Sequence, residues 1–117
     1  MFRLSLSPGL KEEIRRVFTF VEAEEDKIVV VAKVRELWKI VDGDRPSALL
    51  ARAVLRNTSW ASDRVPEWAG GTPVGEPIVV AEIPRGEVER ILQHGLELGY
   101  REEVEFLEEF LGLVAEA

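Results

Sequence analysis

The chain has 117 residues and a formal net charge of −7, with 46% of its residues hydrophobic and 32% charged. This balance is typical of a folded globular protein, and the length fits a single domain over residues 1–117. The absence of cysteine and the single histidine exclude disulfides, thiolate metal sites and Cys/His zinc sites, and we expect neither a metal nor a cofactor.

The apolar pattern of the chain predicts its location. No apolar run approaches the roughly eighteen residues that a membrane span requires. Pro8, Gly9 and Lys11 also interrupt any apolar segment near the N-terminus, so no secretory signal is evident. We therefore expect a cytoplasmic protein without a membrane partner. The excess of glutamate over aspartate, together with a single Asn and a single Gln, is typical of thermophilic proteins.

The first third of the chain predicts a strand, a helix and a hairpin. Residues 2–6 alternate between apolar and polar side chains, as in a short strand. Ser7 fits the N-cap of an amphipathic helix over residues 8–16, which begins with proline. Residues 17–22 and 27–32 are rich in β-branched and aromatic side chains and predict the two strands of a hairpin. The continuous apolar run of the second strand predicts a central place in the sheet.

Residues 33–41 fit two patterns. Val34, Leu37 and Val41 are spaced three and four residues apart, as on one face of a helix. The segment from Leu37 to Val41 can equally alternate between the two faces of a strand. We favour a third strand, because the preceding segments are rich in β-forming residues and the sequence DGD that follows is a good turn.

The second half of the chain predicts one strand and three helices. A helix covers residues 45–56, and residues 57–75 form a long irregular loop with prolines and glycines. Residues 76–84 predict a short strand whose bounding prolines suit the edge of a sheet. Two helices follow, over residues 84–98 and 100–115. This order predicts an α+β fold, in which a mainly antiparallel sheet of three to five strands is covered by three or four helices, two of them C-terminal.

Charge is unevenly distributed, and residues 45–64 form a basic island in an acidic protein. The segment holds four arginines and one acid, which gives a net charge of +3. Three arginines share one stripe of the predicted helix, and the fourth lies between two tryptophans of the loop. Arginine binds phosphate and carboxylate through two parallel hydrogen bonds, and tryptophan stacks on nucleobases. The candidate ligand-binding residues are therefore Arg45, Arg52, Arg56, Asn57, Trp60, Arg64 and Trp68.

A structural role is the alternative for the same residues. Arginines of an acidic, thermophile-like protein often form ion pairs with the protein's own acids, and the glutamate-rich last helix offers such partners. The tryptophans would then hold the loop against the core, or line a pocket or a partner surface. The net negative charge repels polyanions at long range, which disfavours nucleic acid as a partner.

Catalysis is a further alternative, with a pocket beneath the loop of residues 57–75. Acid–base chemistry needs carboxylates that converge, and Asp63 and Glu82 are the candidate catalytic residues. Glu82 shares a strand face with Ile78 and Val80, which would bury it in part. We favour an exposed position at the end of the strand, because carboxylates are rarely fully buried.

The sequence alone does not identify the function, and three hypotheses follow in order of preference. The first is a non-enzymatic interaction module that self-associates, whose basic island faces an acidic protein partner, a small anion or the chain's own acidic C-terminal surface. The wide apolar arc of the last helix fits such a second subunit as well as the chain's own core. The second is binding of a nucleotide or single-stranded nucleic acid, and the third is a small hydrolase or transferase.

Overall fold

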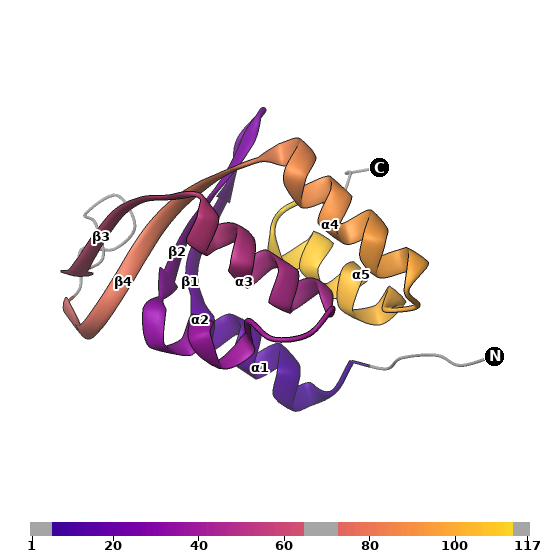
Figure 1. Cartoon of the computed structure of the whole chain (residues 1–117), viewed down its shortest axis with the longest axis horizontal. Coiled ribbons are helices and arrows are strands. Elements are labelled where there is room, and N and C mark those ends of the chain that lie inside the picture. Colours follow the sequence, from indigo (N-terminus) through magenta and orange to yellow (C-terminus); the bar gives the residue numbers. More distant parts are fainter. Residues whose placement is uncertain (1–5, 65–72, 114–117) are drawn as a thin grey trace.

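The computed structural model describes residues 6–64 and 73–113, of which residues 62–64 and 73–75 are described by their backbone. Most of the strand expected over residues 2–6 therefore lies outside the described residues. In chain order the elements are α1 (Pro8–Val17), β1 (Phe18–Ala23), β2 (Lys27–Lys33), α2 (Val34–Ile40), α3 (Pro46–Arg56), β3 (Thr58–Arg64), β4 (Pro73–Pro84), α4 (Arg85–Glu97) and α5 (Arg101–Phe110) (Figure 1).

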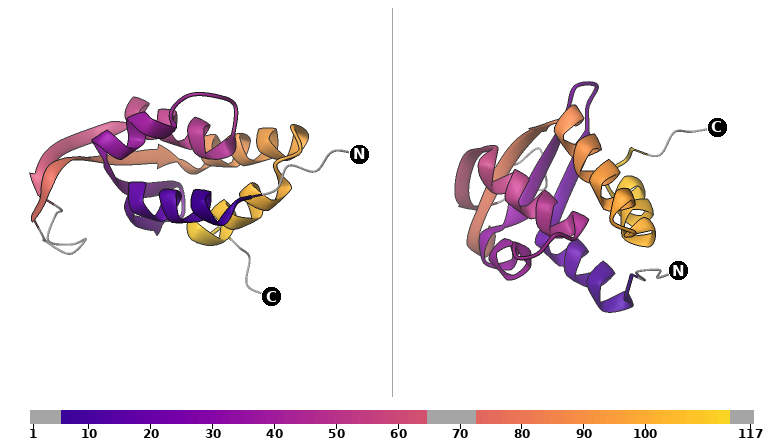
Figure 2. Two further views of the ribbon diagram at one scale, coloured as in Figure 1. Left: turned by 90° about the horizontal axis from the view of Figure 1, so that it is seen from below. Right: turned by 45° about the vertical axis from the view of Figure 1, so that its right-hand side comes forward.

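The described helices all pack on one face of a four-stranded antiparallel sheet, whose strand order is β1-β2-β4-β3 (Figure 2). On that face the main core joins Ile28 and Val30 of β2 and Ala81 and Ile83 of β4 to apolar side chains from every helix. The expected α+β fold is confirmed. The interior position of β2 is confirmed as well, since strands pair with it on both sides.

Local sequence signals set the ends of several helices. Ser7 caps α1 as predicted, because its side chain accepts a hydrogen bond of 3.2 Å from a backbone N–H in the first turn. Gly99 and Gly112 adopt positive φ after α4 and α5, and the backbone hydrogen bonds around them form Schellman caps. Because Gly112 stops α5, that helix ends at Phe110, earlier than the helix expected over residues 100–115.

The strand expected over residues 33–41 is wrong, because Lys33 ends β2 and Val34–Ile40 forms helix α2. The helix turns Val34, Leu37 and Val41 toward the core, where Leu37 is fully buried, and leaves Trp38 61% exposed. β2 already has an antiparallel neighbour on each side, so a further meander strand beside it has no place in the sheet. Tertiary packing thus decides between two structures that the local pattern allowed. α2 also brings the described helices to five, above the expected three or four.

The irregular loop expected over residues 57–75 is wrong in its described part. Thr58–Arg64 forms β3, which pairs with β4 at the edge of the sheet and sets Trp60 opposite Val80. Its register shifts at two points, as is common in edge strands. An edge strand is held mainly by backbone hydrogen bonds to one neighbour, so its polar sequence lacks the apolar alternation of an interior strand. Residues 65–72 lie outside the described residues.

The short edge strand expected over residues 76–84 is also wrong in its length and position. β4 has 12 residues and lies in the interior of the sheet, between β2 and β3. Pro84 pairs with Lys27 at one end of the ladder with β2, and Pro77 lies just beyond Ile78 at the other end. Proline has no backbone N–H, but at these end positions its absence leaves the hydrogen bonds inside the β2–β4 pairing intact. The prolines therefore mark the limits of the ladder and not an edge.

Candidate functional site

The residues of the basic island divide between two sides of the sheet. Arg45, Arg52 and Arg56 belong to α3 and its N-cap, on the face that the helices cover. Trp60 lies on β3 opposite Val80, whose side chain belongs to the other face. The structure therefore does not bring the arginine stripe and Trp60 onto one surface. The predicted site residues without a described side chain are Asp63, Arg64 and Trp68.

Arg45 contacts the acidic C-terminal helix of its own chain. Its Nε donates to Oε1 of Glu103 at 2.8 Å, and its guanidinium lies 5.0 Å from the ring centroid of Tyr100. The buried Glu103 also accepts the backbone N–H of Ser47 at 2.8 Å, at the start of α3. Arg45 and Glu103 thus connect α3 to α5. This contact is an ion pair with the chain's own last helix, the structural alternative given above for the island.

Arg52 and Arg56 also bind groups of their own chain. Arg52 donates to two backbone carbonyls in the turn before α3. Arg56 donates to Oε1 of Glu87 in α4 at 2.8 Å, and Asn57 donates to the other carboxylate oxygen at 3.0 Å. The hydrogen bond from Arg56 is the main reason that the pKa of Glu87 lies below its ordinary value. Each of these three island residues therefore has an internal role.

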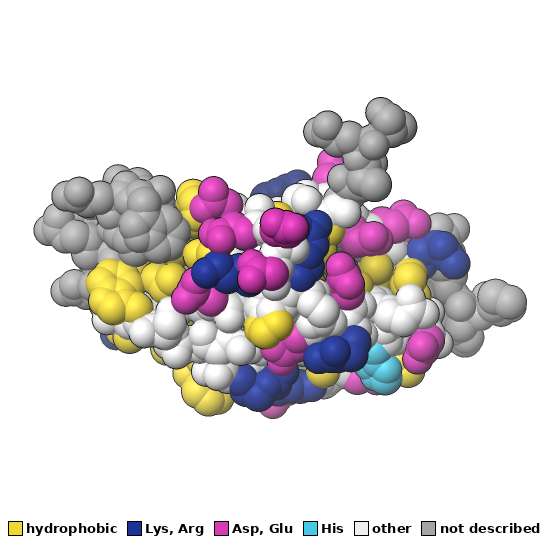
Figure 3. Space-filling view, turned by 90° about the horizontal axis from the view of Figure 1, so that it is seen from above, with side chains coloured by type: hydrophobic (Ala, Val, Ile, Leu, Met, Phe, Trp, Pro, Cys, Tyr) yellow, Lys and Arg dark blue, Asp and Glu magenta, His cyan; other side chains and the backbone are white. Residues whose placement is uncertain are grey.

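The opposite face of the sheet, which none of the described helices covers, has an apolar centre. We refer to it as the helix-free face. Trp60 belongs to this face, and 45% of its surface is exposed. Figure 3 shows this side of the molecule, with acidic and some basic side chains over the sheet and exposed apolar side chains beside them. The buried apolar cluster of the face consists of Val29, Val31, Ile78 and Val80, with Phe20 packed against it.

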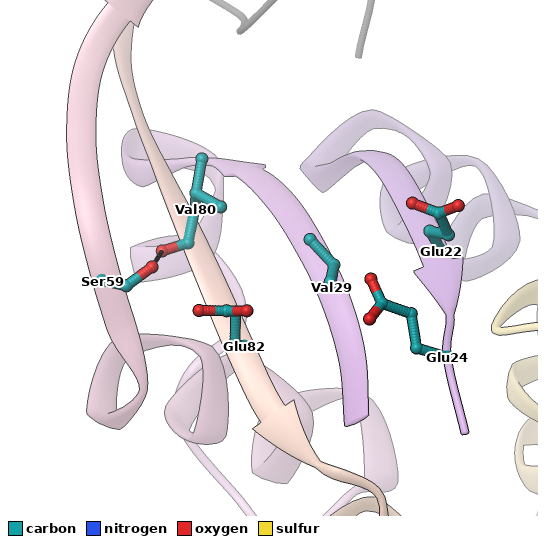
Figure 4. A pocket seen from close by; sticks show the side chains of 6 residues that line it. All are labelled: Glu22, Glu24, Val29, Ser59, Val80 and Glu82. Carbon is teal, nitrogen blue, oxygen red and sulfur yellow. Dashed lines mark hydrogen bonds between the residues drawn. The ribbon is translucent and has the colours of Figure 1, made fainter. Parts of the chain in front are cut away.

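An open hollow of about 560 Å³ lies on the helix-free face. Two valines form its apolar floor, and three glutamates line it beside them (Figure 4). On the β3 side, a serine hydroxyl donates to a carbonyl of β4 at 3.2 Å. The hollow thus offers apolar surface and several carboxylates within one depression. It is lined by Glu22, Glu24, Val29, Ser59, Val80 and Glu82.

Lys27 partly neutralises the hollow from its rim. Its Nζ forms a close ion pair with Glu82 and lies 4.0 Å from Glu24. The hydrogen bond to Glu82 is the main reason that the pKa of Lys27 is raised. Within the described residues, Glu22 forms no ion pair. Three carboxylates and one ammonium leave a net charge of −2 at the hollow, from three negative charges and one positive charge.

Glu82 is the candidate catalytic residue whose side chain the structure describes. That side chain is 45% exposed, as we favoured for the end of the strand. In the part of the chain that the structure describes, no group of three or more acidic or histidine side chains is arranged to hold a metal ion. The described helices are all too short or too polar to cross a membrane.

Sequence reasoning identified Glu82 in the hollow and Trp60 on the same face, but it missed the other residues that line the hollow. A signal for Glu22 was present, because it follows Phe20 on one face of the predicted hairpin. The pairing of β2 with β4 could not be predicted, and this pairing sets Val29 opposite Glu82. The hollow therefore arises from contacts between segments that lie far apart in the sequence.

Comparisons with known proteins give no relative for this chain. No protein-family model, no curated protein and no solved structure matches it. The site must therefore be interpreted from its own geometry and chemistry.

Proposed function

We propose that this protein is a non-enzymatic interaction module that binds another polypeptide on the helix-free face of its sheet. The observation that carries the proposal is the open hollow on that face, which has an apolar floor of Val29 and Val80 and lies beside the exposed Trp60. Exposed aromatic side chains next to apolar clusters are enriched where proteins bind one another.

The contacts of the basic island support this choice of surface. Arg45, Arg52 and Arg56 donate hydrogen bonds to their own chain, so an anion would have to displace these partners before it could bind. Nucleotide or nucleic-acid binding, the alternative from the sequence, therefore has less support. An enzymatic role also has less support, because the hollow is open and Glu82 is exposed to water.

A second copy of the chain is a poor partner for the helix-free face. A two-fold axis between two such faces would bring the glutamates of both hollows together, and like charges oppose binding across an interface. We therefore propose a partner of a different sequence, in the cytoplasmic setting that the apolar pattern predicts. Self-association would use another surface, and light scattering at several protein concentrations tests it.

Peptide display tests the proposed binding surface. A library of random peptides is selected on the full chain, and the bound peptides are measured against Trp60→Ala and Leu98→Ala. Leu98 is a matched control, because it is an apolar side chain that is 40% exposed at the end of α4, away from the helix-free face. We expect Trp60→Ala to weaken binding of most selected peptides by about tenfold or more. We expect Leu98→Ala to leave it unchanged.

Two results would contradict the proposal. One is a selection that yields no binding peptide. The other is a set of peptides whose affinities are the same for the unmodified chain and for Trp60→Ala. Circular dichroism spectra of both variants should match that of the unmodified chain, so that a loss of binding reports on the surface and not on folding.

A further inference from the structure

We infer that the partner of the helix-free face is cationic: a polypeptide segment whose lysine or arginine side chains enter the acidic hollow. This inference rests on the proposed function, because it specifies the partner of the same face. It adds the chemical class of the partner, which the random peptide library leaves open.

The arrangement of carboxylates favours a positively charged ligand. Glu22 comes from β1, Glu24 from the turn after it and Glu82 from β4, and all three line one hollow (Figure 4). Carboxylates that line one hollow repel one another, and a cation among them offsets that repulsion. Lys27 shows that an ammonium group is suited to this position, since its Nζ contacts Glu82 and lies 4.0 Å from Glu24.

The apolar parts of the hollow favour a side chain with a long aliphatic stem. Val29 and Val80 form the floor, and both are more than nine-tenths buried within the sheet. Lysine and arginine lay their methylene groups along such surface while the charged end reaches carboxylates. Trp60, opposite Val80 on the neighbouring strand, offers a ring over which a guanidinium or ammonium group can stack. A simple metal ion would use the carboxylates but not these apolar contacts.

Titration with two synthetic peptides tests the inference. One peptide has nine residues of alternating lysine and leucine with blocked ends, and the other has glutamate in place of lysine. Chemical-shift changes in the ¹⁵N-labelled full chain locate binding and give the dissociation constant at low and at physiological salt. We expect the lysine peptide to shift amides of the hollow, with an affinity that falls as salt is added, and the glutamate peptide to shift none.

Two sets of variants with the same net charge separate a local effect from a general one. The hollow variant is E22Q/E24Q/E82Q, and the control variant E12Q/E97Q/E105Q neutralises three exposed glutamates of the helices. At low salt we expect the hollow variant to bind the lysine peptide about tenfold or more weakly than the unmodified chain does. We expect the control variant to lose less than about twofold in affinity. The variant E22Q/E24Q repeats the test with the Lys27–Glu82 pair intact.

The outcomes distinguish this inference from the proposed function. Equal weakening in the hollow and control variants, or shifts confined to the helices, would overturn the cationic partner. Selected display peptides that depend on Trp60 but carry no lysine or arginine would also overturn it, while the proposed function would stand. If no peptide binds in a way that depends on Trp60, both the cationic partner and the proposed function are overturned.

Discussion

Single residues at the start of α3 determine how the C-terminal helices join the rest of the molecule. The hydroxyl of Tyr100 donates to Oδ1 of Asp44 at 3.0 Å, and Arg45 lies over the same tyrosine ring. Glu103, one turn along α5, accepts the N–H of Ser47 and the Nε of Arg45. The first turn of α3 leaves backbone N–H groups without helical partners, and Glu103 supplies one of the missing acceptors.

The ionisation of Tyr100 provides a pH-dependent measure of its contact with Asp44. Its pKa lies above the ordinary value of 10.0, chiefly because its hydroxyl donates a hydrogen bond to Asp44. The folded state thus favours the protonated phenol. The stability from this bond is complete below the ordinary pKa and is lost as the pH rises through the raised pKa. We expect Asp44→Asn to lower the midpoint pH of the Tyr100 titration. The ultraviolet absorbance of tyrosinate measures this midpoint, and the signal belongs to Tyr100 because the chain has one tyrosine. An unchanged midpoint would contradict the role of Asp44.

Removal of the Glu103 carboxylate tests the connection between α3 and α5. Glu103→Ala leaves the N–H of Ser47 and the guanidinium of Arg45 without their acceptor, and we expect a loss of about 2 kcal/mol in the free energy of unfolding. Urea denaturation followed by circular dichroism measures it. Glu105→Ala is the control, because Glu105 is exposed on the same helix, and we expect a change within about 0.5 kcal/mol. Equal effects of the two variants would refute a special role of Glu103.

At the scale of helices, α3, α4 and α5 meet at a point that only glycine allows. A Cβ on Gly95 would lie 2.5 Å from Cγ of Pro46 in α3 and 2.9 Å from Cγ2 of Val104 in α5. Both distances are shorter than carbon atoms tolerate, and a proline ring cannot rotate away. Gly95 therefore sets how closely the three helices approach one another.

Alanine at this position tests the close approach. We expect Gly95→Ala to lower the free energy of unfolding by about 1–3 kcal/mol, because overpacking outweighs the gain of up to about 1 kcal/mol in helix propensity. Gly86→Ala in the same helix is the control, since a Cβ there would meet only an arginine side chain at 3.9 Å. It should leave stability equal or slightly higher in the same urea denaturation. A neutral or stabilising Gly95→Ala would show that the helices can separate without cost.

At the scale of the whole molecule, one layer of helices leaves the two faces of the sheet with different roles. The continuous apolar run of β2 buries residues on both faces, in the main core and in the smaller cluster of Val29 and Val31. The main core holds the fold together, because the described helices all contribute to it. The helix-free face holds the hollow and Trp60, and so is the surface where we place binding.

The sequence by itself determined the parts of this protein that depend on near neighbours in the chain. The cap at Ser7, the hairpin of residues 17–32, α3 and the start of α4 follow from local hydrogen bonds and from the spacing of apolar residues. The α+β class follows from their order.

Only the tertiary structure decided the features that join distant segments. It made Val34–Ile40 a helix, because β2 has neighbours on both sides, and it placed β4 in the interior of the sheet. It also gave Arg45 its partner Glu103 and set Glu82 beside Val29 to form the hollow. The physical reason is the same in each case: the energy comes from contacts between residues far apart in sequence, and periodicity within one segment does not encode which segments meet.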